Sequence, residues 1–315
     1  MAVSVGLPSL STEPVASLIR VLDMASTGPD TFEGTSLPQL RHQVFGGQML
    51  AQATIAAAST LGDDAARAGT YPHSLHASFI RPALTNVPIT YRVGRIRDGR
   101  TSATRRVDAR QGDDTVCSVM VSLARPTSGG PAHSAPLPQV PAPTSLRDSI
   151  EIFQASGHPV AQFLGKTVAF SLRHVSGSLY VSTPAGDATT HDVWVRPRTH
   201  IPAASPTLSH ALLAYVSDQI ILEPVLRSLG LNWSTPNLRV ASLDHAMWFH
   251  RPCHINDWHL FHLSSPVSAG GRSLARGEVY NEAGDLVASL TQEGLVRVSS
   301  DDGFWAIAGN ADTRS

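Results

Sequence analysis

VASLDHAMWFHRP, residues Val240–Pro252, is the stretch that decides the fold, because PHSLHASFIRP at Pro72–Pro82 repeats its pattern. Both are apolar runs interrupted by histidine and closed by Arg-Pro. The arginines of the two Arg-Pro pairs, Arg81 and Arg251, differ in number by 251 − 81 = 170, and Arg106 and Arg276 have the same offset, 276 − 106 = 170. We therefore interpret the chain as one structural unit used twice.

The segments that flank the two echoes match as well. A helical stretch of small residues, Val44–Thr60, precedes the first echo, and another helical stretch, Leu208–Leu226, precedes the second. Strand-like runs joined by a polar turn follow each echo, at Ala103–Ala109 and Thr115–Ala124 in the first unit and at Arg272–Tyr280 and Leu286–Val298 in the second. A long helix followed by antiparallel strands, twice over, predicts an α+β fold.

The length of 315 residues leaves room for roughly two domains of 100–200 residues. A Pro-rich stretch at 126–145 has six prolines and no Asp, Glu, Lys or Arg, which is typical of an extended linker. We expect a flexible N-terminus at 1–16, an N-terminal domain at 17–126, a linker at 127–145, a C-terminal domain at 146–298 and a tail at 299–315.

Composition excludes several classes of partner. The chain is 42% hydrophobic and 16% charged, which is enough apolar material for a buried core. Its formal net charge of −1 gives no indication that it binds a polyanion or a membrane surface. The chain has two cysteines, Cys117 and Cys253. One possible disulfide is too few to form the framework of a fold of this length. The first residues lack the features of a signal peptide, and no apolar run approaches ~20 residues. We expect a cytoplasmic protein that binds neither nucleic acid nor membrane.

Asp218 is the most informative single residue. It is the only Asp, Glu, Lys or Arg between Leu208 and Leu222, and helical spacing places it on one face with Tyr215. An acid on an apolar helix face is expensive to bury unless it has partners or a task. The structural alternative, an Asp bonded to a nearby turn or cap, stays open.

Two further polar residues lie in predicted strands. Alternation along the second echo puts Ser242 on one side with Asp244 and Trp248, and His245 on the other side. Gln292 lies in the strand Leu286–Arg297. Each has a structural alternative, since a lone strand glutamine is usually solvated or bonded across the sheet.

The duplication allows a comparison between the units. The offset of 170 places Pro72 opposite Ser242 and Ser122 opposite Gln292, and the first helix has no acid between Val44 and Thr60. The first unit therefore does not duplicate these polar residues. This is expected where one copy carries the catalytic residues and the other only helps to enclose the site.

Other catalytic signatures are absent from the sequence. There is no Gly-x-Ser-x-Gly elbow, which leaves a serine hydrolase of the usual type unsupported. A histidine-rich stretch lacks both His-Glu-x-x-His and Cys-x-x-Cys, so we expect no zinc site there; its members are His245, His250, His254, His259 and His262. We interpret His73, His76 and His245 as packed strand histidines.

Six segments in order, VFGGQMLAQA, HSLHASFIRP, IRDGRTSATRRV, YVSD at 215–218, SLDHAMWFHRP and LVASLTQEGLVR, resemble the acyl-CoA thioesterase II (TesB-like) family. The resemblance covers about residues 20–126 and 190–298 and implies a double hotdog. In that fold two long central helices are each wrapped by an antiparallel sheet, and the sheets join side by side. It also implies hydrolysis of fatty acyl-CoA to free fatty acid and CoA.

The resemblance further implies that an Asp, a Thr or Ser, and a Gln hold the attacking water. By position in the matching segments these are Asp218, Ser242 and Gln292; some relatives have Thr where this chain has Ser242. For the oxyanion we hypothesise the backbone N–H groups of Gly46 and Gly47, because helix starts offer unpaired donors. No metal or cofactor is expected, and hotdog enzymes tend to form homo-oligomers.

Two alternatives stay open at this point. The chain could be another hotdog enzyme, an enoyl-CoA hydratase or acyl dehydratase, or a non-catalytic acyl-CoA sensor in which the polar trio is incidental. The acyl chain-length preference depends on a tunnel built from residues far apart in sequence, which the sequence does not reveal.

Overall fold

The computed structural model describes residues 13–62, 69–127, 129, 131–156, 159–180 and 188–298. Residues 1–12 of the expected N-terminal segment and the whole expected tail, 299–315, lie outside this described part. The boundaries 17–126, 127–145 and 146–298 remain a proposal, and the elements given below are compatible with them.

The helices are α1 Pro14–Leu22, α2 Gly46–Ser59, α3 Ser149–Ala155, α4 Pro159–Thr167, α5 Pro206–Ile220 and α6 Glu223–Ser228, with a 3-10 turn at Pro143–Ser145. The strands of the first unit are β1 Ala25–Gly28, β2 Thr31–Gly34, β3 Tyr71–Phe79, β4 Ile89–Asp98, β5 Ser102–Gln111 and β6 Asp114–Ala124. Those of the second are β7 Phe170–His174, β8 Thr190–Pro197, β9 Leu238–Ser242, β10 Asp244–Phe249, β11 His259–Ala269, β12 Arg272–Asn281 and β13 Leu286–Val298.

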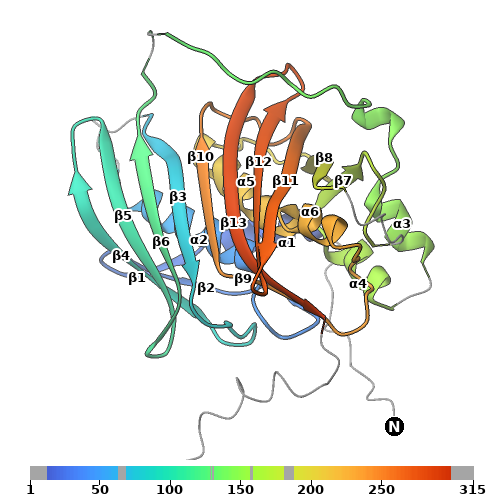
Figure 1. Cartoon of the computed structure of the whole chain (residues 1–315). Coiled ribbons are helices and arrows are strands. Elements are labelled where there is room, and N and C mark those ends of the chain that lie inside the picture. The colour runs from blue at the N-terminus through green and yellow to red at the C-terminus, as the bar shows by residue number, and fades with distance from the viewer. Residues whose placement is uncertain are drawn as a thin grey trace, which may run out of the picture.

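The strands form one antiparallel sheet in the order β1-β2-β4-β5-β6-β3-β10-β13-β12-β11-β8-β7, with β9 paired to β13 (Figure 1). The two echo stretches, in β3 and β10, pair with each other at the centre of this sheet. His76 pairs with Ala246, which is its own counterpart at the repeat offset. A strand position that pairs with its own repeat indicates twofold symmetry. A pseudo-twofold axis therefore passes between β3 and β10 and relates the two units.

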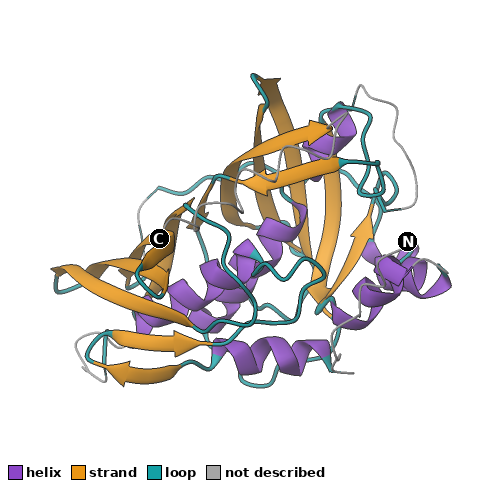
Figure 2. Cartoon of the chain, turned by 90° about the horizontal axis from the view of Figure 1, so that it is seen from below, coloured by secondary structure: helices purple, strands orange, loops and turns teal. Residues whose placement is uncertain are grey.

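Two central helices, α2 and α5, lie in the hollow of the curved sheet (Figure 2). Both are almost fully buried, and Leu50 of α2 and Val216 of α5 have no exposed surface. Gly47 lies where the two helices approach closely, since an added Cβ would lie 2.3 Å from the Tyr215 carbonyl oxygen. Only glycine lets the two helix backbones come this near. This arrangement is the double hotdog that the sequence resemblance implied.

The prediction of a single second helix over Leu208–Leu226 is wrong. The helix α5 ends at Ile220, and α6 begins at Glu223. Pro224 lies in the first turn of α6. Proline has no N–H to donate to the carbonyl four residues earlier and clashes with it, so the chain turns and starts again.

The predicted alternation along the second echo is correct within β10, where Asp244 and Trp248 are exposed and His245 is buried. It is wrong for Ser242. The β9–β13 ladder pairs Ser242 with Gly294, whereas the β10–β13 ladder pairs Ala246 with Thr291, so the two ladders are offset by one residue. Leu243 and Asp244 both oppose one residue of β13. This is a β-bulge, and it inverts which side chains point inward.

The bulge is held by two hydrogen bonds. The Leu243 N–H donates to the Glu293 carbonyl oxygen at 2.9 Å, and the Glu293 N–H donates to Asp244 Oδ1 at 2.8 Å. Ser242 therefore shares its side of the sheet with His245, and not with Asp244. The first unit has a register shift at the equivalent place in β3, between Pro72 and Ser74. The repeat thus includes the bulge.

The Pro-rich segment before α3 crosses the outer face of the second unit (Figure 1). Trp194 Nε1 donates to the Pro141 carbonyl oxygen at 3.0 Å. Leu137 and Val140 pack against a small apolar cluster that includes Trp194 and Trp258. The segment is extended but anchored. In the described part of the chain, every helix is too short or too polar to span a membrane.

Candidate active site

The three residues singled out in the sequence lie together, although they come from three elements. Gln292 Nε2 on β13 donates to Ser242 Oγ at the end of β9, 2.8 Å away. Ser242 Oγ donates to Asp218 Oδ1 on α5 at 3.1 Å. Gln292 is fully buried, and Asp218 and Ser242 are half-buried. A buried amide, a hydroxyl and a carboxylate therefore form one hydrogen-bonded row that ends near the surface.

The local sequence explains each placement. Ser205 caps α5 by accepting from the Leu208 N–H at 3.1 Å, which fixes where the helix starts and so where Asp218 points. Gln292 is an inward position of β13. The bulge after Ser242 turns its hydroxyl toward Gln292. Without that extra residue the hydroxyl would face the other side of the sheet.

The start of α2 faces the same carboxylate. A Cβ added at Gly46 would lie 2.7 Å from Asp218 Oδ2, so the bare backbone of Gly46 borders the oxygen that Ser242 leaves free. The first N–H groups of a helix have no intrahelical acceptor and carry the positive end of its dipole. Gly46 and Gly47 come from the first unit and Asp218 from the second, so the site lies between the two units.

The symmetry-related location lacks the polar row. Pro72 and Val121 occupy the positions equivalent to Ser242 and Gln292, and α2 carries no acid. The prediction that Ser122 lies opposite Gln292 is wrong, because the β12–β13 turn is one residue longer than the β5–β6 turn, so Ser122 corresponds to Glu293. His210 Nδ1 lies 2.8 Å from the Pro72 carbonyl oxygen, to which it donates. The duplicated fold therefore has this polar row in its second unit alone, as the comparison of the two echoes predicted.

His245 is a site neighbour that the sequence reasoning missed. The side chain is 1% exposed, with Nδ1 2.5 Å from Gln292 Oε1 and Nε2 3.2 Å from Ser217 Oγ. Burial lowers the pKa of His245, against the opposing effect of the Asp218 charge and the Gln292 bond, so the imidazole is neutral near pH 7. Strict alternation put His245 and Ser242 on opposite sides, and the bulge puts them on the same side.

A largely apolar cavity of about 200 Å³ is lined by residues that neighbour the site residues along the chain. Its lining includes Leu37, Phe45, Phe163, Tyr215 and Gln219. The Phe45 and Tyr215 rings meet edge to face with centroids 5.1 Å apart. Asp218, Ser242 and Gln292 do not line the cavity, but Phe45 precedes Gly46 and Tyr215 lies one helical turn before Asp218. A pocket of this kind suits an extended apolar ligand.

The cysteines do not offer a nucleophile. Cys117 and Cys253 are both free and buried. Burial, with smaller contributions from the charges of Asp218 and Asp108, raises the pKa of Cys117 to about 12. Burial likewise raises the pKa of Cys253 to about 12. Both remain thiols at neutral pH, and a thiol is a far weaker nucleophile than a thiolate.

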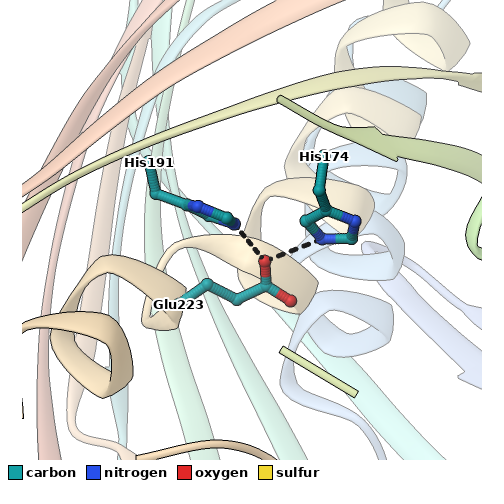
Figure 3. Close-up of side chains that lie close together, drawn as sticks. All are labelled: His174, His191 and Glu223. Atoms are coloured by element: carbon teal, nitrogen blue, oxygen red, sulfur yellow. Dashed lines mark hydrogen bonds and ion pairs between the residues drawn. The ribbon is translucent and has the colours of Figure 1, made fainter. Parts of the chain in front are cut away.

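A second polar cluster lies beside α6, where His174, His191 and Glu223 meet (Figure 3). Glu223 Oε2 accepts from His174 Nε2 at 2.9 Å and from His191 Nε2 at 2.8 Å. Burial alone would raise the pKa of Glu223, but the two imidazoles hold it below its ordinary value, so the carboxylate is charged. The bonds tie α6 to β7 and β8.

The bonding of His191 distinguishes this cluster from a metal centre. Arg227 Nε donates to His191 Nδ1 at 3.1 Å, which leaves the imidazole proton on Nε2. A nitrogen that carries a proton cannot ligate a metal. Elsewhere in the described ranges no other three His, Cys, Asp or Glu side chains converge as closely, and the histidines at 245–262 are not gathered around one point.

Comparison with known proteins follows the same division into units. A family model described as acyl-CoA thioesterase N-terminal domain matches residues 36–124, and one described as acyl-CoA thioesterase matches residues 170–295. Acyl-CoA thioesterase 2 of Haemophilus influenzae is 31% identical over 286 residues, covering 90% of this chain and 98% of its own. Human acyl-coenzyme A thioesterase 8 is 28% identical, covering 88% of each chain.

Solved structures agree. The tesB protein of Mycobacterium avium subspecies paratuberculosis superposes with a TM-score of 0.72 at 29% identity, covering 90% of this chain and 99% of that one. The acyl-CoA thioesterase II TesB2 of Mycobacterium marinum gives a TM-score of 0.70 at 30% identity, with the same coverage. Since sequence identity and fold agree along both repeats, the chain belongs to the TesB-like acyl-CoA thioesterase II family and is an acyl-CoA hydrolase.

Proposed function

We propose that this hydrolase cleaves fatty acyl-CoA to free fatty acid and CoA by direct attack of a water molecule held by Asp218, Ser242 and Gln292. The observation that supports it most is the hydrogen-bonded row. Ser242 donates its one hydrogen to Asp218 Oδ1, which leaves Oδ2 free to accept from water. The reaction in this proposal uses no covalent intermediate, metal or cofactor.

The chemistry needs a base and an oxyanion site. Asp218 Oδ2 takes a proton from the water as the water oxygen bonds to the thioester carbonyl carbon, and the carbonyl oxygen becomes an oxyanion. The C–S bond then breaks, and the electron pair leaves with sulfur as CoA thiolate. A thiol has a pKa near ~8.5, so the thiolate leaves without an obligatory general acid. The proton on Asp218 then returns to solvent.

Gly46 and Gly47 supply the oxyanion donors in this proposal. Their N–H groups open α2, and Gly46 borders Asp218 Oδ2, where the water would lie. A donor aimed at a developing oxyanion is typically worth ~10²–10³ in rate. The base comes from one unit and the donors from the other, which gives a physical reason for both repeats.

The acyl chain is assigned to the largely apolar cavity. Its wall includes the apolar side chains of Phe45, Leu37 and Phe163, and Phe45 directly precedes Gly46. Burying a chain there removes apolar surface from water, at roughly 0.8 kcal/mol per CH₂. The cavity thus gives the fatty chain a place while the thioester faces Asp218.

The test is Asp218→Asn, which keeps the shape and removes the base. With CoA release followed by a thiol reagent, kcat should fall ~10²–10⁴-fold while the melting temperature stays close to that of wild type. Asp114→Asn is the matched control, because Asp114 is an exposed carboxylate at the start of β6 that takes no part in the polar row. Undiminished turnover by Asp218→Asn would refute the assignment.

Two further measurements separate the alternatives. Crotonyl-CoA followed in the ultraviolet reports hydration, which this proposal does not expect. Tight acyl-CoA binding with no thiol released would instead favour a sensor. We also propose that the enzyme works in the cytoplasm as a homo-oligomer; light scattering would show a monomer if the second part is wrong.

A further inference from the structure

One buried histidine beside the proposed site has no role in the mechanism above. His245 lies between Gln292 and Ser217 and is 1% exposed. Its Nδ1 is 2.5 Å from Gln292 Oε1, and its Nε2 is 3.2 Å from Ser217 Oγ. Both ring nitrogens are engaged with protein groups, so the imidazole does not face the substrate.

The direction of each hydrogen bond follows from the carboxylate at the end of the row. An ionised Asp218 only accepts, so Ser242 must donate to it. The Ser242 oxygen can then only accept from Gln292, so the amide nitrogen of Gln292 must face Ser242. This orientation turns the amide oxygen toward His245, which must donate from Nδ1.

The far end of the row is consistent with this direction. A neutral imidazole that carries its hydrogen on Nδ1 offers a lone pair on Nε2. The Ser217 hydroxyl donates to the Ala214 carbonyl oxygen at 2.9 Å and lies 3.2 Å from His245 Nε2, so its single hydrogen faces both acceptors. From His245 Nδ1 through Gln292 and Ser242 to Asp218, each of the three hydrogen bonds therefore joins a donor to an acceptor.

We propose that His245 is a positioning residue that fixes the Gln292 amide with its nitrogen toward Ser242 and the thioester. The inference rests on the proposed function, because it gives a purpose to the orientation of Gln292. One hydrogen on Gln292 Nε2 goes to Ser242, and the second is left for the water or the carbonyl oxygen of the substrate.

The opposite orientation of the Gln292 amide would break the hydrogen bonds of the row. With Gln292 Oε1 toward Ser242, one hydroxyl hydrogen would face two acceptors, Gln292 Oε1 and Asp218 Oδ1. The amide oxygen would also present negative partial charge where negative charge develops on the substrate. His245 prevents this rotation. Its buried Nδ1–H needs an acceptor, and the oxygen is the only atom of the Gln292 amide that can accept a hydrogen bond.

The first repeat provides an internal comparison. By strand pairing, the first-unit counterparts of His245, Ser242 and Gln292 are Leu75, Pro72 and Val121. The imidazole, the hydroxyl and the amide are all replaced together. Leu75 is completely buried, so the fold accommodates leucine at this position of the repeat. His245 therefore varies with the hydroxyl and the amide as a set.

The test compares two substitutions of similar size. His245→Asn places an amide nitrogen at the position of Nδ1 and can still donate to Gln292; His245→Leu cannot. We expect His245→Leu to lower kcat roughly 10- to 100-fold with little change in KM, as for residues that orient a reacting group. His245→Asn should recover most of the loss. Equal losses in the two variants would overturn the proposal.

A double-mutant cycle with Gln292→Ala separates positioning from general damage. Once Gln292 is gone, His245→Leu should cost little further activity. If it still lowers kcat by the same factor, His245 acts independently of Gln292 and the inference is wrong. His259→Leu is the control, since His259 is equally buried but lies on β11, which β13 and β12 separate from β10; it should lower the melting temperature and leave kcat unchanged.

Failure of the proposed function would look different. In that case Asp218→Asn and Gln292→Ala would themselves keep wild-type kcat. If those single variants lose activity while the two His245 variants behave alike, the proposed function stands and only the inference about His245 fails.

Discussion

Replacing Gly46 with alanine tests the site most directly, because the structure gives both the place and the size of the perturbation. The new methyl group would lie 2.7 Å from Asp218 Oδ2 and 3.0 and 3.1 Å from two carbons of the Phe79 ring. A water hydrogen-bonded to Oδ2 also sits ~2.7–2.8 Å from that oxygen. The methyl group therefore competes with the water that Asp218 is proposed to hold.

The expected magnitudes differ between activity and stability. Losing the base would cost up to ~10²–10⁴ in kcat. The fold should lose no more than the ~1–3 kcal/mol that overpacking typically costs. The clashing atoms are also side-chain ends, which can shift.

Gly47→Ala provides the contrast one residue later. There the methyl group would lie 2.3 Å from the Tyr215 carbonyl oxygen, a backbone atom of α5, and 2.6 Å from the Phe45 ring. The two central helices must separate, so this variant should lose stability first, at or above about 3 kcal/mol. Gly28→Ala is the neutral control, since nothing lies within 4 Å of the added Cβ.

The assay pairs CoA release with thermal unfolding on the same preparations. We expect Gly46→Ala to melt near wild type and turn over slowly, Gly47→Ala to melt early, and Gly28→Ala to match wild type in both. A stable Gly46→Ala enzyme with unchanged kcat would mean that the space beside Asp218 Oδ2 is not where the water reacts.

Two further predictions concern stability. Both carboxylate oxygens of Glu223 accept hydrogen bonds, Oε2 from His174 and His191 and Oε1 from Trp233 Nε1. Glu223→Gln removes the charge and replaces one of these oxygens by an NH₂ group, so urea unfolding should show a loss of roughly 1–3 kcal/mol while kcat of the folded enzyme is unchanged; unaltered stability would contradict the network. Burial lowers the pKa of His210 and of His259 to about 4, so both stay neutral in the fold while the unfolded chain protonates below about 6.5. Stability should be full above that pH and fall as the pH drops toward about 4, by at most roughly 3 kcal/mol for each histidine, and a His259→Leu variant should show a shallower decline.

Much of the fold could be predicted because local sequence patterns indicate it. The constant offset between the two echoes revealed the duplication, and alternation in Arg272–Tyr280 and Leu286–Val298 placed two central strands correctly. Such patterns report whether a residue faces a core, which depends on the period of the element. Asp218 stood out for the same reason, as a lone acid on an apolar helix.

The site was only partly predictable. Resemblance to a family selected Asp218, Ser242 and Gln292, but alternation alone put Ser242 on the wrong side and described His245 as a packed histidine. The cause is the bulge at Leu243 and Asp244, which opposes two residues to one. A bulge is defined by how a strand pairs with its neighbour. The sequence of one strand alone therefore does not reveal it.

By itself the sequence determined the repeat and most of the elements, because those depend on residue type and local spacing, and its resemblance to a family selected the polar trio. Only the tertiary structure decided that β9 and β10 meet β13 in different registers, that Gly46 of one unit borders Asp218 of the other, and that Gln292 has a buried donor behind it. These relations join residues that are far apart in the chain, and the packing of the helices against the sheet fixes them.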